Sequence, residues 1–228
     1  MVESLVVPAD MAFSEPDRAA VYRAIAVRRD VRRGFIDKPL PDELLQRLLA
    51  AAHSAPSVGF MQPSRFIVIR DSAIRREIHG IFQDARSDAA ANYSGERAEQ
   101  YGALKLEGIL EAPQNLCIVY DTQNERGHKL GRHTMPETAA YSTVCAVQNL
   151  WLAARAEGVG VGWVSILDLN RLRTALHIPD HILPVAYLCL GYVDKFASEP
   201  ELETAGWEKR VPLQTVISYD AYSEHAAS

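Results

Sequence analysis

One segment limits the fold of this chain more than any other, because it has helical spacing and almost no polar face. Thr134-Met135-Pro136-Glu137 has the spacing of a capping box with proline in the first turn, and Gly158 follows as a stop. Between them lie the apolar residues Ala139, Ala140, Tyr141, Val144, Ala146, Val147, Leu150, Trp151 and Ala154. A helix that is apolar nearly all round must be covered on all sides. It therefore lies either at the centre of the domain or in a subunit interface, and a chain of 228 residues can supply both.

The other regular segments mix helices and strands without a strict alternation. Helical spacing predicts helices at 14–28 and 42–53, and a short one at 169–176. Apolar runs predict strands at 66–69, 116–120, 161–164 and 182–190. We therefore expect a single domain over residues 1–228, of the α+β class, with a mixed central sheet flanked by helices.

Two segments do not fit a compact core. Residues 84–108 are rich in charges and in alanine, with little to hold them on a core, so they are either a mobile flap or a plain surface excursion. Residues 211–219 look like an isolated strand, which needs the edge of its own sheet or of a partner's sheet.

Charge and cysteine content exclude several classes of function. A net charge of −5 and a pI near 5.8 argue against nucleic acid as a partner. The cysteines Cys117, Cys145 and Cys189 are odd in number and have no C-x-x-C spacing, which indicates a reducing compartment. We find no metal-ligand spacing, no signal peptide and no apolar run of about 18 residues, so we expect a cytoplasmic protein with no membrane partner.

The first group of residues with chemical potential is Arg28-Arg29-Asp30-Val31-Arg32-Arg33, at the end of the first predicted helix. The planar guanidinium donates hydrogen bonds in pairs, which suits a phosphate dianion. The alternative is a solvated basic turn that interacts with the helix dipole.

The second group is the loop 55–66, which reads Ala-Pro-Ser-Val-Gly-Phe-Met-Gln-Pro-Ser-Arg-Phe. A helix stopped by proline, a glycine and a Gln-Pro step into a strand make an ordered loop with many polar groups. The alternative is an ordinary connection from a helix to a strand.

Together the two groups resemble the opening of the nitroreductase family, in which an R-R-S-x-R-x-F and an A-P-S-x-x-N-x-Q-P stretch bracket one helix. The resemblance continues through Glu157–Trp163, Leu188–Tyr192 and Lys209–Pro212, and covers most of the chain from Arg28 to Val216. Gly158, Gly160 and Gly162 are not a dinucleotide fingerprint, because a helix precedes them and a strand follows.

The resemblance implies a homodimer that binds FMN at the subunit interface and exchanges its C-terminal extension between subunits. It implies FMN contacts from Arg28, Arg29, Asp30, Val31, Arg32, Pro56, Ser57, Gly59, Met61, Gln62, Trp163, Ser165, Leu167, Lys209 and Arg210.

Two departures from the general family narrow the resemblance. Asp30 stands where nitroreductases usually have Ser, and Phe60 where they usually have Asn. The runs R-R-D-V-R, P-S-V-G-F-M-Q-P and G-W-V-S-I-L-D are similar to those of the 5,6-dimethylbenzimidazole synthases. That group converts reduced FMN and dioxygen into dimethylbenzimidazole, the lower ligand of cobalamin, and erythrose 4-phosphate, so that the flavin is a substrate.

Asp30 and Ser165 are the catalytic candidates. A carboxylate is a suitable base for proton transfers beside the ribityl chain, and neighbouring arginines favour its ionised form. The alternative for Asp30 is a salt-bridged turn residue. Ser165 could bind the flavin or a peroxide, but Ser165-Ile166-Leu167-Asp168 also has capping-box spacing and could simply begin the next helix.

Two other functions are compatible with the same residues. One is an NAD(P)H-dependent FMN reductase or nitroreductase, and the other is a non-catalytic FMN-binding protein, which needs the arginines but not Asp30. A flavin-cleaving enzyme also needs a source of electrons, either its own reaction with NAD(P)H or a separate flavin reductase.

Overall fold

The computed structural model describes residues 13–223. Its α-helices are α1 (Glu15–Val27), α2 (Asp42–His53), α3 (Ser72–Ala90), α4 (Gly95–Ala103), α5 (Thr138–Ala156), α6 (Leu169–Ala175) and α7 (Glu201–Thr204). Its strands are β1 (Ser64–Ile69), β2 (Gln114–Asp121), β3 (Val159–Val164) and β4 (Ile182–Tyr192). Short 3₁₀ turns lie at Val58–Phe60, Arg126–Lys129 and Leu213–Val216.

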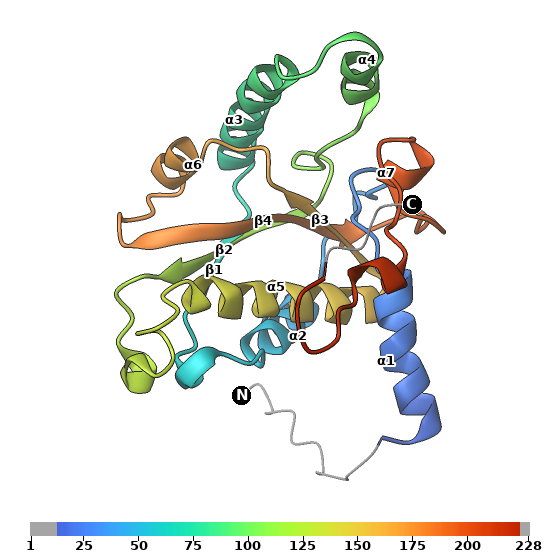
Figure 1. Cartoon of the computed structure of the whole chain (residues 1–228). Coiled ribbons are helices and arrows are strands. Elements are labelled where there is room, and N and C mark those ends of the chain that lie inside the picture. Colours follow the sequence, from blue (N-terminus) through green and yellow to red (C-terminus); the bar gives the residue numbers. More distant parts are fainter. Residues whose placement is uncertain (1–12, 224–228) are drawn as a thin grey trace.

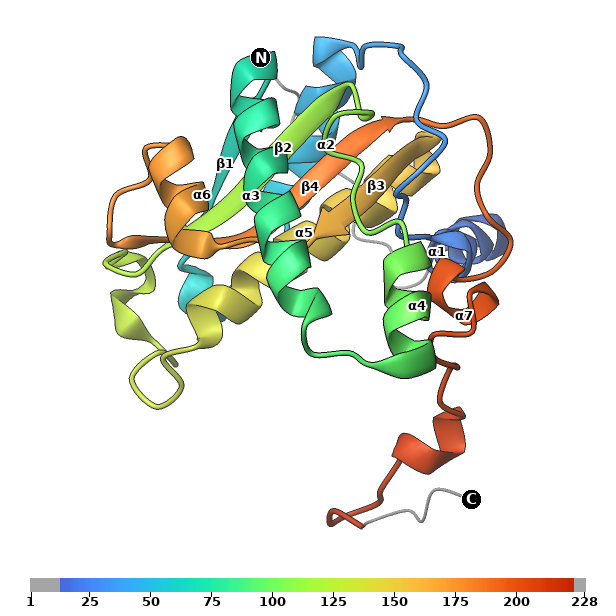
Figure 2. The same ribbon diagram turned by 90° about the horizontal axis from the view of Figure 1, so that it is seen from above.

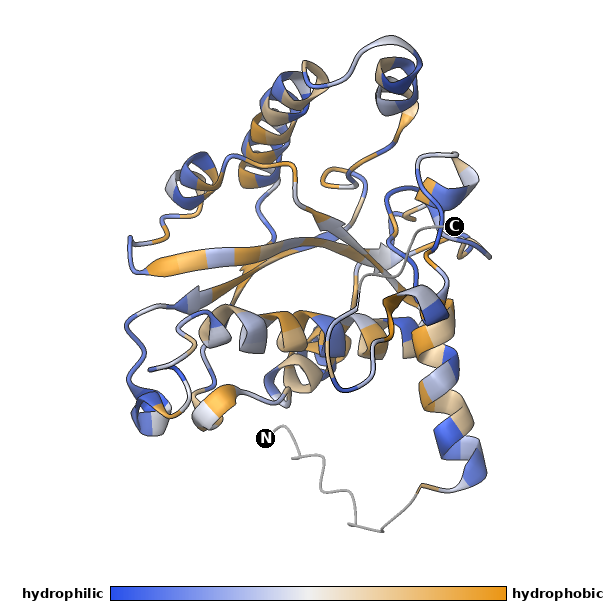
Figure 3. Ribbon diagram, in the orientation of Figure 1, coloured by the Kyte–Doolittle hydropathy of each residue, from blue (hydrophilic) through white to orange (hydrophobic). Residues whose placement is uncertain are grey.

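The sheet has the strand order β1-β2-β4-β3, and its helices lie in two layers (Figures 1 and 2). Along β2, Leu116 and Ile118 join the core that includes α2 and α5, whereas Cys117 and Val119 join the core that includes α3 and α6. This alternation follows from the two-residue period of a strand. Strands β2 and β4 lie at the centre of the sheet between the two helix layers, and residues 116–119 of β2 and most of β4 are accordingly apolar; Figure 3 shows the hydrophobic first part of β4.

The predicted α+β class is confirmed, but the predicted mixed sheet is wrong. All three strand pairs, β1 with β2, β2 with β4 and β3 with β4, are antiparallel. Within residues 13–223, the parallel contact is the isolated bridge between Asp30 and Val161. This contact involves a single residue pair, which is too short to be predicted as a strand, and it places Asp30 beside β3.

Two local predictions are also corrected. Helix α5 begins at Thr138 without a side-chain cap, because the Thr134 hydroxyl bonds to the Gly131 carbonyl instead. Residues 211–219 contain a 3₁₀ turn and no strand. Most of residues 84–108 is helical, and Tyr101 and Leu104 are buried; a mobile flap in this segment stays a prediction.

The central helix α5 is covered on only part of its circumference. Its buried face includes Ala146, Leu150 and Ala154, which pack against the sheet and α2. The opposite stripe is open, with Tyr141 55% exposed and Val144 also exposed. Helix α1 has no buried residue, and its Tyr22 is 71% exposed. Both expected roles of the apolar helix therefore remain open to it, a domain core on one side and a subunit interface on the other.

The structure also bears on membranes, metals and thiols. None of the helices between residues 13 and 223 is long and apolar enough to cross a lipid bilayer. No group of three potential metal-binding His, Cys, Asp or Glu side chains occurs in this part of the chain. Cys117 and Cys189 are buried free thiols, and burial raises the pKa of Cys117 to about 12.

We predict a homodimer that uses the open stripe of α5. Val144→Asp places a charge in that stripe and should yield a monomer at micromolar concentration, because an obligate interface of more than roughly 2,000 Å² does not tolerate an unpaired buried charge. Light scattering measures the mass. Leu169→Asp is the matched control, since Leu169 is an exposed apolar residue on α6. A wild-type monomer, or a Val144→Asp dimer, would contradict the assignment.

Candidate functional site

The arginine segment is fixed to the open edge of β3 by the backbone. Helix α1 ends where Arg28 adopts an extended conformation, and the chain then runs beside β3. The Val31 N–H donates to the Val161 carbonyl at 2.9 Å. A Cβ atom at Gly162 would lie 2.1 Å from the Val31 carbonyl oxygen, so only glycine permits this approach.

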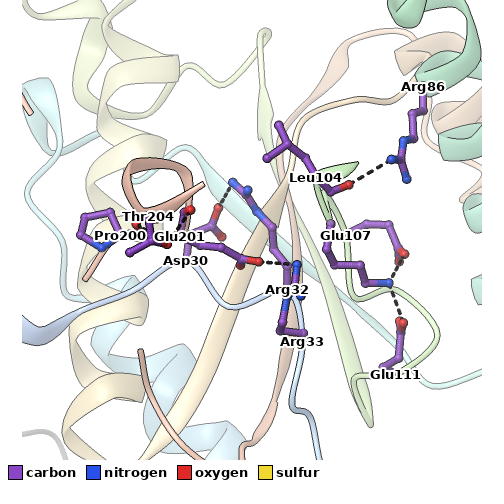
Figure 4. Close-up of polar contacts among 11 residues, drawn as sticks. Asp30, Arg32, Arg33, Arg86, Leu104, Glu107, Glu111, Pro200, Glu201 and Thr204 are labelled. Atoms are coloured by element: carbon purple, nitrogen blue, oxygen red, sulfur yellow. Dashed lines mark hydrogen bonds and ion pairs between the residues drawn. The ribbon is translucent and has the colours of Figure 1, made fainter. Parts of the chain in front are cut away.

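Asp30 is held by bonds to both of its carboxylate oxygens. Oδ1 accepts the Trp163 backbone N–H at 2.9 Å, and Oδ2 pairs with the Arg32 guanidinium at 2.5 Å (Figure 4). The Asp30 side chain is 27% exposed and that of Arg32 is 13% exposed. The carboxylate is therefore anchored to the sheet, yet part of it remains accessible to a ligand.

Four arginines gather around one cavity of about 180 Å³. It is lined by Arg28, Arg29, Asp30, Arg32, Pro200, Glu201, Leu202 and Arg210. The structure thus brings the C-terminal Arg210 to the segment at the end of α1. Helix α5 supports the cluster, because the Arg28 guanidinium lies 5.0 Å from the Trp151 ring centroid and the Trp151 indole donates to the Arg29 carbonyl at 3.2 Å.

The cluster has unused donors and uncompensated charge. The Nε atoms of Arg29 and Arg32 are buried without a hydrogen-bond partner among the described residues. Burial and the charges of Arg23 and Arg29 lower the pKa of the Arg155 guanidinium. The Glu201 carboxylate offsets part of the charge by pairing with Arg33 at 2.5 Å. Buried donors without an acceptor are costly, so a phosphate dianion fits this cavity.

The second predicted group forms an ordered loop. The Ser57 hydroxyl accepts the Gln62 N–H at 3.0 Å, and the Met61 carbonyl accepts the Asn124 amide at 2.8 Å. Gly59 has φ of +59°, and a Cβ there would lie 2.7 Å from the Leu130 carbonyl. The 3₁₀ turns at Val58–Phe60 and Arg126–Lys129 pack against each other and hold this loop in place. The turn at Arg126–Lys129 was not predicted from the sequence.

The side chains of the loop differ in exposure. Met61 is buried, whereas Phe60 is 73% exposed. Gln62 Oε1 accepts the Arg126 guanidinium at 3.1 Å. Pro56, Ser57 and Gln62 line a small cavity beside α5.

Within one chain, the loop and the arginines lie at different ends of α5. The Val58 N–H donates to the Ser142 hydroxyl at 3.2 Å, whereas the arginine cluster adjoins Trp151. At 1.5 Å per residue, Ser142 and Trp151 are about 13 Å apart along the helix. The two groups line separate cavities.

The residues at the end of β3 differ in their surroundings. The Trp163 ring is partly buried, with its centroid 6.3 Å from that of Trp151. Ser165 is exposed, and its hydroxyl makes no hydrogen bond within residues 13–223. Asp168 caps α6 through the amides of Asn170 and Arg171, so the alternative that Ser165 begins this helix is wrong. Leu167 packs on the core shared with α3.

Sequence reasoning missed several residues near the arginines. Pro200, Glu201 and Leu202 line the cavity, and the Arg155 guanidinium lies 3.9 Å from the Phe196 ring centroid. Phe196, Pro200, Glu201 and Leu202 lie in segment 193–208, which Arg155 contacts from α5. This segment has no periodic hydrophobic pattern, so its position could not be predicted from the sequence. Lys209, which we expected beside Arg210, is exposed and does not line the cavity.

The sequence is similar to those of known enzymes. The 5,6-dimethylbenzimidazole synthase of Rhodospirillum rubrum is 48% identical over 189 residues, which cover 83% of this chain and 89% of that protein. The enzyme of the same name from Rhodobacter capsulatus is 40% identical over 204 residues, covering 90% and 98%.

Solved structures share the fold. Iodotyrosine deiodinase, in a structure with FMN and 3-iodo-L-tyrosine, has a TM-score of 0.70 at 21% identity, covering 89% of this chain and 100% of that one. The NADPH:FMN oxidoreductase of Vibrio harveyi has a TM-score of 0.65 at 19% identity, covering 90% and 79%. Residues 25–192 match the nitroreductase family itself. The chain belongs to the nitroreductase family, within which its relatives include the 5,6-dimethylbenzimidazole synthases.

Proposed function

We propose that this protein cleaves reduced FMN with dioxygen to 5,6-dimethylbenzimidazole and erythrose 4-phosphate, with the four carbons and two nitrogens of the flavin's pyrimidine ring leaving as a third fragment. The observation that carries the proposal is the position of Asp30, whose partly exposed carboxylate lines the arginine cavity and is fixed to the β3 edge. Relatives that are 37 to 48% identical and are named for the synthesis of dimethylbenzimidazole support it.

In this proposal the phosphate of FMN lies among Arg28, Arg29, Arg32 and Arg210. The unpartnered Nε atoms of Arg29 and Arg32 support this placement, because a dianion would supply their acceptors. The Val31 backbone then borders the flavin, together with the residues from Trp163 to Leu167 at and after the end of β3. Pro56, Ser57, Gly59, Met61 and Gln62 would reach it from a second copy of the chain, since within one chain this loop lies apart from the arginines and its Pro56, Ser57 and Gln62 line a separate cavity.

Asp30 and Ser165 have separate roles in the proposed reaction. Reduced FMN supplies the electrons for oxygen chemistry, and forming the benzimidazole requires that the first ribityl carbon be cut from the chain and retained. Asp30 moves protons beside that carbon as a general base. Ser165 contributes a hydroxyl free to bond the flavin or an oxygen species. Asp30 also braces Arg32 and β3, so its structural and chemical roles must be separated by experiment.

The reaction needs flavin that is already reduced. We propose that NAD(P)H supplies the electrons indirectly, either through slow chemistry of this protein or through a separate flavin reductase. The relevant assay therefore begins with chemically reduced FMN.

We predict that incubation with reduced FMN in air gives permanent loss of the yellow flavin. Visible absorption follows the flavin, and chromatography detects the benzimidazole. Recovery of oxidised FMN with turnover of NADH would instead indicate a reductase, and bound flavin without turnover would indicate a binding protein.

We predict that FMN binds more than a hundredfold more tightly than riboflavin. The arginines donate charge-assisted bonds of roughly 1.5 to 3 kcal/mol each, and two such bonds account for this ratio. Calorimetry with the two flavins measures it. Equal affinities would contradict the phosphate assignment.

We predict that Asp30→Asn lowers benzimidazole formation per bound flavin by roughly a hundredfold to ten thousandfold, the range for one general acid–base group. FMN binding should survive, because Asn retains an acceptor for the Trp163 N–H and frees the charge of Arg32 for phosphate. Affinity and product yield are measured on one preparation.

The matched control is Asp180→Asn, since Asp180 pairs with Arg173 at 2.5 Å outside the site. Its product yield should equal that of the wild type. If Asp30 only braces the turn, Asp30→Asn should weaken flavin binding and leave the yield per bound flavin unchanged, which would end the catalytic assignment.

A further inference from the structure

The segment that follows β4 carries Arg210 to the arginine cavity along an irregular path. Along this path the Ser198 carbonyl accepts a bond from Arg29, and Glu201 pairs with Arg33. Helix α7 ends at Thr204 and is followed by Gly206, which has φ of +70°, and the Trp207 N–H closes the turn by donating to the Leu202 carbonyl at 2.9 Å. Trp207 follows this turn and does not line the cavity.

Trp207 is held by three side chains from the region of α4. Its ring centroid lies 5.4 Å from that of Tyr93, edge to face, and 6.2 Å from that of Tyr101. The Arg97 guanidinium lies 4.7 Å from the Trp207 ring centroid and donates to the Trp207 carbonyl at 2.9 Å. We call Tyr93, Arg97, Tyr101 and Trp207 the Trp207 clamp.

The base of the clamp is fixed to the domain. Tyr101 is only 5% exposed, and its ring centroid lies 4.7 Å from that of Tyr93. The Arg86 guanidinium of α3 donates to the Gly102 and Leu104 carbonyls, each at 3.0 Å, and so ties the end of α4 to α3 (Figure 4 shows the bond to Leu104). The clamp thus joins the C-terminal segment to a packed part of the fold.

Between Trp207 and Arg210 the chain has little support of its own. The Lys209 N–H donates to the neighbouring Glu208 carboxylate, which is a local contact. Arg210 makes no hydrogen bond or ion pair within residues 13–223, although it lines the cavity. Three residues of extended chain span up to about 10 Å, so the position of Arg210 depends on the anchor that precedes it.

We propose that Trp207 is a positioning residue for Arg210, and that the Trp207 clamp thereby increases the preference of the site for a flavin phosphate over uncharged riboflavin. This inference rests on the FMN site proposed above. A cation held in place before binding loses less conformational freedom when the phosphate arrives, so anchoring raises affinity without any contact between Trp207 and the ligand.

If Trp207 positions Arg210, the two residues must be energetically coupled in FMN binding. Removing the anchor leaves the charge of Arg210 present but poorly placed, so the loss must be smaller than that caused by removing Arg210 itself. Once Arg210 is absent, the anchor has nothing to position. The two changes must therefore be non-additive, which a double-mutant cycle measures.

The experiment is calorimetry of FMN and riboflavin binding to Trp207→Ala, Arg210→Ala and the double variant of the full chain. We expect Trp207→Ala to weaken FMN binding about fivefold to tenfold and to leave riboflavin affinity unchanged. A loss of this size is typical of the coupling energy between residues that act together. In the Arg210→Ala background Trp207→Ala should have no further effect. Trp207→Phe keeps an aromatic ring on Arg97 and should restore most of the affinity.

A further pair of variants tests the α4 side of the clamp. Arg97→Ala should weaken FMN binding in the same direction as Trp207→Ala. Arg76→Ala is the matched control, because Arg76 is an exposed arginine on α3 and should leave both affinities at the wild-type values.

Each contrary outcome has a distinct meaning. Equal losses for both flavins, or effects that add with Arg210→Ala, would show that Trp207 only supports the fold and would overturn the inference. If Arg210→Ala weakens FMN binding and Trp207→Ala does not, the inference is overturned and the FMN site stands. No effect of Arg210→Ala on FMN would remove Arg210 from the phosphate site and overturn this inference, whereas equal affinities of the wild type for FMN and riboflavin would overturn the phosphate site itself.

Discussion

The close contact between the arginine segment and the edge of β3 is the constraint on which the rest of the site depends. Gly162 leaves room for the Val31 carbonyl, and the Val31 N–H bonds to Val161. The sheet thereby fixes the direction of the side chains on either side, so that Asp30 reaches the Trp163 amide and Arg32 reaches the carboxylate. A residue with a side chain at position 162 would displace the arginine segment from β3. The Asp30 carboxylate would then be separated from the Trp163 amide that orients it.

In the proposed function, one short segment serves both binding and chemistry. The arginines supply charge for a phosphate, and Asp30 supplies a carboxylate beside it whose orientation is set by two bonds. Binding energy at the phosphate can then hold a substrate in register with a reacting group some distance away, which is how remote contacts support a reaction. In the proposed homodimer the second loop would contribute to this site from the other copy, and the open stripe of α5 and the exposed α1 are the surfaces available for that interface.

Much of the fold could be predicted from the sequence, because periodic patterns record burial. The strands and helices α1, α2 and α6 follow from apolar spacing, and the arginine segment was identified by its residue types. The sheet was misjudged as mixed, since strand direction depends on long-range pairing that no local pattern encodes. The predicted cap at Thr134 was wrong, because the Thr134 hydroxyl bonds to the Gly131 carbonyl instead. The alternative that Ser165 caps α6 was wrong, because Asp168 accepts the first amides of that helix. Glu201, Phe196 and Trp207 could not be placed, because they lie in an irregular segment held by individual side chains.

The most direct test of the proposed chemistry follows a single carbon atom. Reduced FMN labelled with ¹³C at the first ribityl carbon is incubated with the protein in air, and the products are examined by NMR. The account predicts that the label appears in the carbon between the two nitrogens of the benzimidazole, and that the sugar phosphate carries none. Label recovered in intact FMN, or in the sugar phosphate, would contradict it.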